Sequence, residues 1–498
     1  MNSNKTFFGH PRGLATLFFT EMWERFSYYG MRAMLLLFMV ATVSEGGMGL
    51  EEKTAGAIYG LYTMFVYLLA LPGGWLADKF FGLRKSVFYG GCIIALGHFC
   101  LALPMAETFF VGLLLIMIGT GLLKPTISSL VGELYSENEP ARRDAGFSIF
   151  YMGINIGGFI APLIVGELRT YNWHYGFAAA GIGMIIGLIQ YKVTEGSLGD
   201  AGLFPERLPD TVLQQKREST IRNSLIGFAV ALVIFVSLLF KRSIVINPVV
   251  VAQASAYILI TSVVAYFLYL MFFTGQNKAG RLKLIALAIF FLTSAMFYSG
   301  YEQQGSSLNL FADRYTDLKW GSFTIRPEWF QSVPSLVVVL FVPVFAWLWV
   351  WLSKRKLNPF TPVKMSLGPI FTALGFATMM GGSMVVAHGN LASPYWLILT
   401  FTFHTFGEIC LYPTGMSATT KIAPKNLVGQ LMGIWFMSLA FGNLVAGLYA
   451  GEFDREAIEA NPGMLVDLFG YFTKIMIGFG LVILVLYKPI RKLMGNVN

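Results

Sequence analysis

Long apolar stretches separated by short polar loops run through the whole sequence. A membrane-spanning helix needs about 20 mainly apolar residues, and six stretches meet this requirement in the first half, two in the middle and six in the second half. They cover residues 14–42, 54–78, 86–104, 108–132, 145–168, 174–192, 222–240, 249–274, 282–311, 328–352, 366–387, 394–422, 427–450 and 464–488. The pattern predicts an all-α polytopic membrane protein with 14 transmembrane helices.

The grouping of these stretches predicts three parts. Residues 1–192 form an N-terminal six-helix bundle, and residues 281–498 form a C-terminal six-helix bundle. Residues 193–280 hold two inserted transmembrane helices, which follow a polar stretch at 194–222 that we interpret as a cytosolic linker with a short helix.

Composition supports lipid as the solvent for most of the chain. Charged residues make up 13% of the 498 residues and hydrophobic residues 55%, whereas soluble domains have about 25% charged residues. This composition excludes an ordinary soluble enzyme.

The net charge of +9 comes from an excess of Lys and Arg that is distributed unevenly between the two predicted sides of the membrane. If the N-terminus is cytosolic, 24 of the 36 Lys and Arg residues lie in cytosolic segments and only 8 on the opposite side. Because cytosolic loops of membrane proteins are enriched in Lys and Arg, this distribution places both termini in the cytosol. The basic excess therefore reports topology, and we expect no nucleic-acid partner.

The sequence gives no sign of a metal site or of enzymatic chemistry. Cys92, Cys100 and Cys410 lie in apolar stretches without metal-type spacing, so we interpret them as packing residues. The phosphate-binding G-x-x-x-x-G-K-[ST] pattern and the H-E-x-x-H and G-x-S-x-G patterns are absent from the sequence. A membrane enzyme or a channel is therefore the weakest of the functional hypotheses.

Seven ionisable residues fall inside the predicted spans. Each would cost about 2.5–3.5 kcal/mol at the centre of a bilayer, so such residues line wet cavities or pair with one another, and are functional candidates. They are Glu21, Glu24, Arg25, Arg32, Lys124, Glu302 and Glu408.

Five polar residues predict a stripe along one side of the first helix. At about 100° per residue, Glu21, Glu24, Arg25, Tyr28 and Arg32 share about a third of its circumference. The alternative interpretation is a structural ion pair between Glu21 and Arg25, which are four residues apart.

The other three charges lie where we expect helices to bend or break. Lys124 is followed by Pro125, Glu302 stands in a polar, glycine-bearing interruption of its helix, and Glu408 precedes Pro413. Transporters build substrate sites at such broken helices near the midplane. A packing or folding role for any one of them stays open.

The seven charges also suggest a coupling hypothesis. Three are positive and four are negative, so one added proton would neutralise the set. Because a neutral cluster is easier to bury than a charged one, a proton and a zwitterion could together stabilise an occluded state.

Three segments resemble motifs of a known family. Residues 21–30, EMWERFSYYG, look like the E-x-x-E-R-F-x-Y-Y-G motif of the proton-dependent oligopeptide transporter (POT/PTR2) family, a branch of the major facilitator superfamily. Residues 150–157, FYMGINIG, are similar to the family's F-Y-x-x-I-N-x-G element, and residues 74–85 resemble the superfamily's gate motif. The resemblance implies the major facilitator fold, in the bacterial form with two inserted helices.

The resemblance implies a proton-coupled symporter that imports di- and tripeptides by alternating access. Its partners would be peptides, protons and membrane lipid, with no cofactor, no obligate protein partner and no enzymatic activity, and its location would be the bacterial inner membrane. The alternative is the same fold with another small anionic or zwitterionic solute, such as nitrate, an amino acid or a drug-like acid.

Residue roles follow from positions in these motifs. Arg25 and Lys124 would hold the peptide carboxylate, Glu408 the amino group and Asn155 a carbonyl. The full implied substrate set is Arg25, Tyr28, Tyr29, Tyr67, Lys124, Asn155, Tyr298, Glu408, Trp435 and Phe436. Proton coupling is assigned to Glu21, Glu24 and Glu302, and gating to Arg32, Glu302 and Asp78.

The sequence departs from the family pattern at a few positions. Tyr298 and Val333 stand where many bacterial relatives have Trp and Asn, so the side-chain preference stays open. Gly60 stands where animal relatives have a proton-sensitive His. His404 could titrate near neutral pH, but we interpret it as a packed residue.

Overall fold

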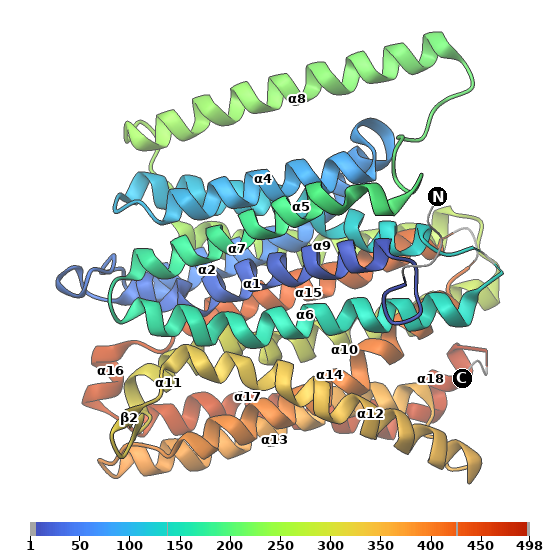
Figure 1. The fold of residues 1–498 in the computed structure, drawn as a ribbon. Coiled ribbons are helices and arrows are strands. Elements are labelled where there is room, and N and C mark those ends of the chain that lie inside the picture. Colours follow the sequence, from blue (N-terminus) through green and yellow to red (C-terminus); the bar gives the residue numbers. More distant parts are fainter. Residues whose placement is uncertain (1–5, 137, 425–426, 496–498) are drawn as a thin grey trace. The chain divides into compact units, whose positions relative to one another are not determined.

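The computed structural model describes residues 6–136, 138–424 and 427–495. Helices make up most of this part of the chain (Figure 1). Two short strands, β1 (Lys319–Trp320) and β2 (Phe323–Thr324), pair antiparallel with Lys319 opposite Thr324. The chain divides into two compact units, and each is described by itself.

The first unit contains Met1–Tyr28, Leu68–Gly157 and His174–Val251. Its helices are the start of α1 (Gly13–Val40), α3 (Ala70–Leu76), the π-helical turn η2 (Ala77–Phe81), α4 (Leu83–Leu101), α5 (Ala106–Glu133), the first part of α6 (Pro140–Arg169), α7 (Trp173–Thr194), η3 (Glu195–Leu198) and α8 (Thr211–Phe240).

The second unit contains Tyr29–Tyr67, Gly158–Trp173 and Ala252–Asn498. Besides the ends of α1 and α6 it holds η1 (Val43–Glu45), α2 (Glu52–Leu68), α9 (Pro248–Phe273), α10 (Lys278–Tyr301), η4 (Glu302–Gly305), α11 (Ser307–Tyr315), η5 (Pro327–Ser332), α12 (Val333–Lys354), α13 (Thr361–Ala387), α14 (Pro394–Ile422), α15 (Val428–Ala450), α16 (Arg455–Ala460), α17 (Met464–Val485) and α18 (Tyr487–Leu493).

Each of the fourteen apolar stretches predicted from the sequence contains a helix. Among the described residues, eleven helices are long and apolar enough to cross a membrane. The count of 14 spans and the three-part domain division stay predictions.

Two local differences from the predicted stretches have physical reasons. Helix α8 begins at Thr211 rather than at 222, because the Asp210 side chain accepts hydrogen bonds from the backbone N–H groups of Val212 (2.8 Å) and Leu213 (3.2 Å). The second apolar stretch is interrupted between α2 and α3 at Leu69, because Pro72 has no N–H to donate to the carbonyl oxygen of Leu68. Helix α5 is continuous through Pro125, and the bend expected there stays a prediction.

The seventh core helix is interrupted where the sequence predicts it. Helix α10 ends at Tyr301, the short 3-10 turn η4 follows, and α11 begins at Ser307. The interruption puts the polar residues Glu302, Gln303 and Gln304 in the interior of the second unit.

Helices α4 and α5 lie side by side in the first unit (Figure 1). Their backbones meet at two pairs of glycines, Gly90 with Gly119 and Gly97 with Gly112. A Cβ atom on Gly119 would lie 2.6 Å from the Gly90 carbonyl oxygen. Small residues of this kind let membrane helices approach closely and gain packing contacts.

We expect Gly119→Val to destabilise the protein, because the added side chain would force α4 and α5 apart. Overpacking of this kind costs about 1–3 kcal/mol. Gly227→Val is the matched control, since Gly227 also lies inside a helix but has nothing within 4 Å of its Cβ position. Thermal unfolding in detergent measures the difference, and equal midpoints for the two variants would contradict the packing argument.

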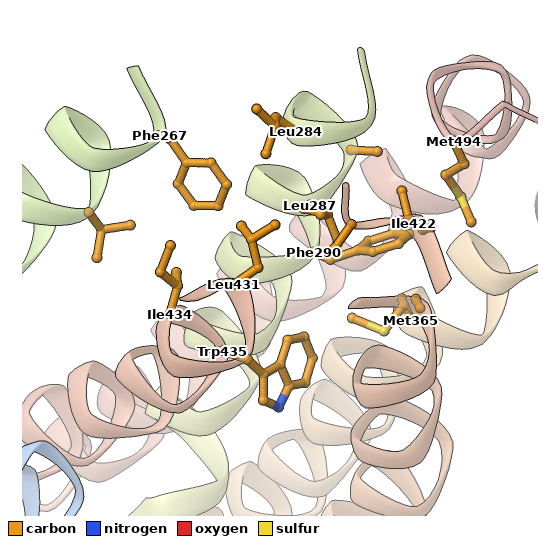
Figure 2. Packing of buried hydrophobic residues seen from close by; sticks show 14 of the residues in the cluster. Phe267, Leu284, Leu287, Phe290, Met365, Ile422, Leu431, Ile434, Trp435 and Met494 are labelled. Atoms are coloured by element: carbon orange, nitrogen blue, oxygen red, sulfur yellow. The ribbon is translucent and has the colours of Figure 1, made fainter. Parts of the chain in front are cut away.

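The apolar core of the second unit includes the inserted helix α9. Figure 2 shows Phe267 of α9 near Leu284 and Leu287 of α10 and Leu431 and Ile434 of α15, and all five belong to one buried cluster. Helix α9 is therefore packed into this unit rather than lying apart from it.

Candidate functional site

Three charges lie together on α1 in the first unit. The Arg25 Nε atom is 3.1 Å from Glu21 Oε1 and also donates a hydrogen bond to Glu24. The guanidinium lies 5.2 Å from the centre of the Tyr28 ring. All four side chains are buried, with no more than 3% of any of these residues exposed. The ion pair between Glu21 and Arg25 is present, but Glu24 and Tyr28 extend it beyond a single structural pair.

Neighbouring helices complete this α1 charge cluster. Lys124 of α5 is half-buried and interacts electrostatically with Glu21. Helix α6 approaches α1 closely, because a Cβ atom on Gly157 would overlap the Met22 carbonyl oxygen. Asn155 of α6 is also buried, and its Nδ2 atom donates to the Tyr151 carbonyl oxygen at 2.9 Å.

The cluster retains unused hydrogen-bonding capacity. In the described part of the chain, neither Glu21 Oε2 nor Glu24 Oε1 has a hydrogen-bond partner. Two carboxylates and two cations, Arg25 and Lys124, give a balanced set if all four are ionised. A role of this cluster in proton coupling stays a prediction.

Glu408 of α14 is surrounded by tyrosines in the second unit. The Tyr301 hydroxyl donates to Glu408 Oε2 at 2.6 Å. Tyr298 and Tyr412 interact electrostatically with the same carboxylate, and the Tyr298 and Tyr301 rings pack edge to face with centres 5.9 Å apart. Among the described residues, no cation pairs with Glu408. This site can therefore accept an ammonium group from a ligand.

Two more of the predicted tyrosines lie near the tyrosines that surround Glu408. Tyr29 interacts electrostatically with Tyr301 and Tyr412, and Tyr67 does so with Tyr298. They are half-buried and come from α1 and α2.

Trp435 is a core residue as well as a predicted pocket residue. Only 2% of it is exposed, and its ring packs against Gly415, where any side chain would overlap it. Figure 2 shows the indole at the edge of the apolar cluster, and its N–H has no acceptor in the part of the chain that is described. Phe436, the next residue, is half-buried.

Arg32 and Glu302 form a buried ion pair in the second unit. Arg32 Nε also donates to the Tyr59 hydroxyl at 2.8 Å. Tyr59 is fully buried and was not predicted, since in the sequence a tyrosine in an apolar helix looks like any core aromatic. The role of this pair as a gate stays a prediction.

Four further ion pairs in the second unit were missed by sequence reasoning. They are Arg169 with Glu328 (2.7 Å) and with Asp313 (3.4 Å), Arg326 with Glu167 (3.1 Å), and Arg314 with Glu52 (2.8 Å). Each partner lies at the end of an apolar stretch, outside the interior that we searched for charge. The signal was available in the opposite charges spaced two residues apart in Glu167 and Arg169 and again in Arg326 and Glu328.

Glu328 is the most deeply buried member of these pairs, with 0% of the residue exposed. Its neighbours in η5 bond to the backbone of α6: Ser332 Oγ donates to the Phe159 carbonyl at 2.7 Å and Trp329 Nε1 to the Leu163 carbonyl at 3.1 Å. Phe159, Leu163 and Glu167 lie on successive turns of α6. The hydrogen bonds and the ion pairs therefore form one row of contacts between α6 and the η5 region.

We expect Arg169→Gln to lower the melting temperature, because it leaves Glu328 buried without its main cation. Breaking one side of a buried pair costs about 3–5 kcal/mol. The double variant Arg169→Gln/Glu328→Gln should recover part of the loss in a thermal unfolding experiment. Arg455→Gln is the control, because its pair with Glu459 is exposed. A double variant as unstable as Arg169→Gln would contradict this reading.

The gate motif, residues 74–85, forms an ion pair and hydrogen bonds with the linker that follows α7 in the same unit. Lys79 pairs with Glu206, which holds the pKa of that exposed carboxyl below its usual value, and the Asp78 carbonyl accepts from the Glu206 backbone N–H at 2.8 Å. Arg84 donates to the carbonyl oxygens of Ala201 and Gly199, both at 2.6 Å. The Asp78 side chain itself is exposed.

The structure therefore groups the predicted residues in two sets. The first unit holds Glu21, Glu24, Arg25, Tyr28, Asp78, Lys124 and Asn155, and the second holds Tyr29, Arg32, Tyr67, Tyr298, Glu302, Glu408, Trp435 and Phe436. Within the first set, Glu21, Glu24, Arg25, Tyr28 and Lys124 lie together, and within the second, Tyr29, Tyr67, Tyr298 and Glu408 lie together and Arg32 pairs with Glu302. That the two sets act on one ligand stays a prediction. His404 is fully buried against Phe376, with ring centres 4.9 Å apart, as expected of a packed residue.

An all-helical chain with many long apolar helices and charges buried inside them defines a multi-pass membrane transport protein. Comparison with known proteins gives the family. The model of the POT family matches residues 84–463, and the chain belongs to this family.

Two curated relatives are similar over nearly the whole length. The peptide transporter YePEPT of Yersinia enterocolitica subsp. palearctica is 41% identical over 99% of this chain and 97% of its own. The di-/tripeptide transporter of Lactococcus lactis subsp. cremoris is 37% identical over 100% of this chain and 99% of its own.

A solved structure has the same fold. It is a crystal structure of a mutant of the peptide transporter POT in complex with alafosfalin, with a TM-score of 0.88 and 40% sequence identity, covering 98% of this chain and 97% of that one. The relatives are transporters, in agreement with the expectation that this chain is not an enzyme.

Proposed function

We propose that this protein is a proton-coupled symporter that imports di- and tripeptides across the bacterial inner membrane by alternating access. The observation that carries the proposal is the burial of charges of both signs inside apolar helices, with Arg25 and two carboxylates in one unit and Glu408 among tyrosines in the other. The names of the relatives support the same substrate class.

The buried charges match the ends of a peptide. Arg25 and Lys124 would bind the peptide carboxylate and Glu408 the amino group, with Asn155 on a carbonyl and the tyrosines as walls. Trp435 and Phe436 would line the side-chain pocket. A zwitterionic ligand needs both a positive and a negative binding group, whereas an uncharged sugar needs neither.

Protons would be the coupling ion, with no other cofactor. Glu21, Glu24 and Glu302 would carry or relay the proton, and Arg32, Glu302 and Asp78 would serve the gates. A potential of about 100 mV supplies about 2.3 kcal/mol per proton, and one pH unit about 1.4 kcal/mol. Together they suffice for accumulation of a few hundredfold.

We further propose 14 transmembrane helices with both termini in the cytosol. The excess of Lys and Arg in alternate loops supports this orientation. Without the two inserted helices both termini would still lie in the cytosol, because removing two crossings returns the chain to the same side of the membrane.

Uptake of labelled dialanine into proteoliposomes tests the proposal. The expected result is accumulation with an inward proton gradient and none without it. Uptake of another solute but not of dialanine would identify the alternative function, and release of free alanine would indicate a membrane enzyme. Accumulation that ignores the gradient would refute the coupling.

A further inference from the structure

A group of basic side chains gathers at one end of the second unit, where α12 ends, α13 begins and α18 lies. We call it the basic-aromatic cluster. Its cations are Lys354, Arg355, Lys356, Lys364, Lys488, Arg491 and Lys492, and its rings are Trp349, Trp351, Phe360 and Tyr487.

Ring contacts connect the three elements. The Arg491 guanidinium lies 3.8 Å from the centre of the Phe360 ring, which stacks on Tyr487 at 6.1 Å. Lys364 Nζ lies 4.6 Å from the centre of the Trp349 ring, which joins α13 to α12. Arg355 covers Trp351 at 4.1 Å. Aromatic faces therefore position Arg355, Lys364 and Arg491 within the cluster.

Among the described residues, no acidic side chain pairs with these cations. Between Glu328 and Glu452 the sequence has one acidic residue, Glu408, and after Asp467 it has none. The Arg491 Nε atom is buried and lacks a hydrogen-bond acceptor in the described part of the chain, and Lys421 of α14 adds repulsion on Lys364.

Exposed apolar residues lie next to the cations on the same helix end. Trp347 is 63% exposed, Val350 54% and Leu357 62%. A partner that fits here has an anionic group for the cations and hydrocarbon for these side chains. Basic pockets between membrane helices and aromatic residues at the bilayer interface have this combination.

We propose that the basic-aromatic cluster binds the phosphate headgroup of an anionic membrane phospholipid, whose acyl chains lie along the exposed face of α12. The phosphate supplies the negative charge that the protein does not provide at this end. The inference uses the membrane placement of the helices and not peptide transport, so a failure of the uptake assay would leave it standing.

Titration of the purified full-length protein with phosphatidylglycerol or phosphatidylcholine, followed by native mass spectrometry, tests the proposal. Lys488→Gln/Lys492→Gln removes two exposed cations and keeps the Arg491 and Lys364 ring contacts, so folding should be retained. Each basic residue near an anionic surface contributes about 1 kcal/mol, so the double variant should bind phosphatidylglycerol about 25-fold more weakly. Lys241→Gln/Arg242→Gln, two exposed cations in the loop between α8 and α9, is the matched control.

Preferential binding of phosphatidylglycerol that is lost in the double variant and kept in the control supports the proposal. Equal affinity for the two lipids, or an unchanged affinity in the double variant, would overturn it. Full competition by inorganic phosphate would also overturn it, because the ligand would then be a free anion. Arg355→Gln/Arg491→Gln gives a second test at the ring contacts, with the same expected loss.

Discussion

Arg25→Ala is expected to reduce the accumulation of dialanine in proteoliposomes to background. Arg25 is 3% exposed and is the cation that Glu21 and Glu24 share. Its loss removes the positive pole proposed for the peptide carboxylate, and a charge-assisted hydrogen bond to such a group is worth about 1.5–3 kcal/mol. The loss also leaves two neighbouring carboxylates with weaker compensation, so a lower melting temperature should accompany the loss of uptake.

A conservative variant separates the two effects. Arg25→Lys keeps the charge and should retain more of the thermal stability, but it loses the planar fork that can contact two carboxylates. We expect uptake to stay low and the melting temperature to recover. Arg455→Ala, which removes an exposed pair with Glu459, is the control and should transport normally. Normal uptake by Arg25→Ala would discredit the assigned positive pole.

The helices could be predicted because lipid imposes a minimum length on apolar segments. What the hydrophobic pattern did not give was the start of α8 at Thr211, since that turn of helix is polar and depends on the Asp210 cap. The division of the second stretch at Pro72 was visible only as one proline among apolar residues.

The charged part of the site could be predicted for an energetic reason. A charge in an apolar helix is expensive, so Arg25, Lys124 and Glu408 stand out from their surroundings. Aromatic residues do not stand out in this way, and Tyr301, which bonds Glu408, and Tyr59, which bonds Arg32, were missed.

The ion pairs at helix ends were missed for the opposite reason. Charges such as Arg169 and Glu328 are common near the ends of spans, and the sequence does not distinguish an exposed one from one that is fully buried. The packing of η5 against its neighbouring helices, α6 among them, makes Glu328 a buried carboxylate.

Glu408→Gln is expected to lower dialanine accumulation by about 10- to 100-fold while leaving the protein at least as stable as the parent. The amide keeps an oxygen for the 2.6 Å bond from Tyr301 but removes the negative charge. Because no cation pairs with Glu408 among the described residues, the charge costs free energy in the resting protein, and the ammonium of a bound peptide would offset that cost. Uptake and thermal unfolding measure the two effects, and Glu459→Gln is the control.

A modified ligand decides whether Glu408 contacts the amino group itself. N-acetyl-dialanine has no ammonium, so it should compete poorly with labelled dialanine in the parent protein. If Glu408 binds the ammonium, the loss from acetylation and the loss from Glu408→Gln should not add, because both remove the same interaction. Fully additive losses in competition assays would place the amino group elsewhere and assign Glu408 to the proton instead.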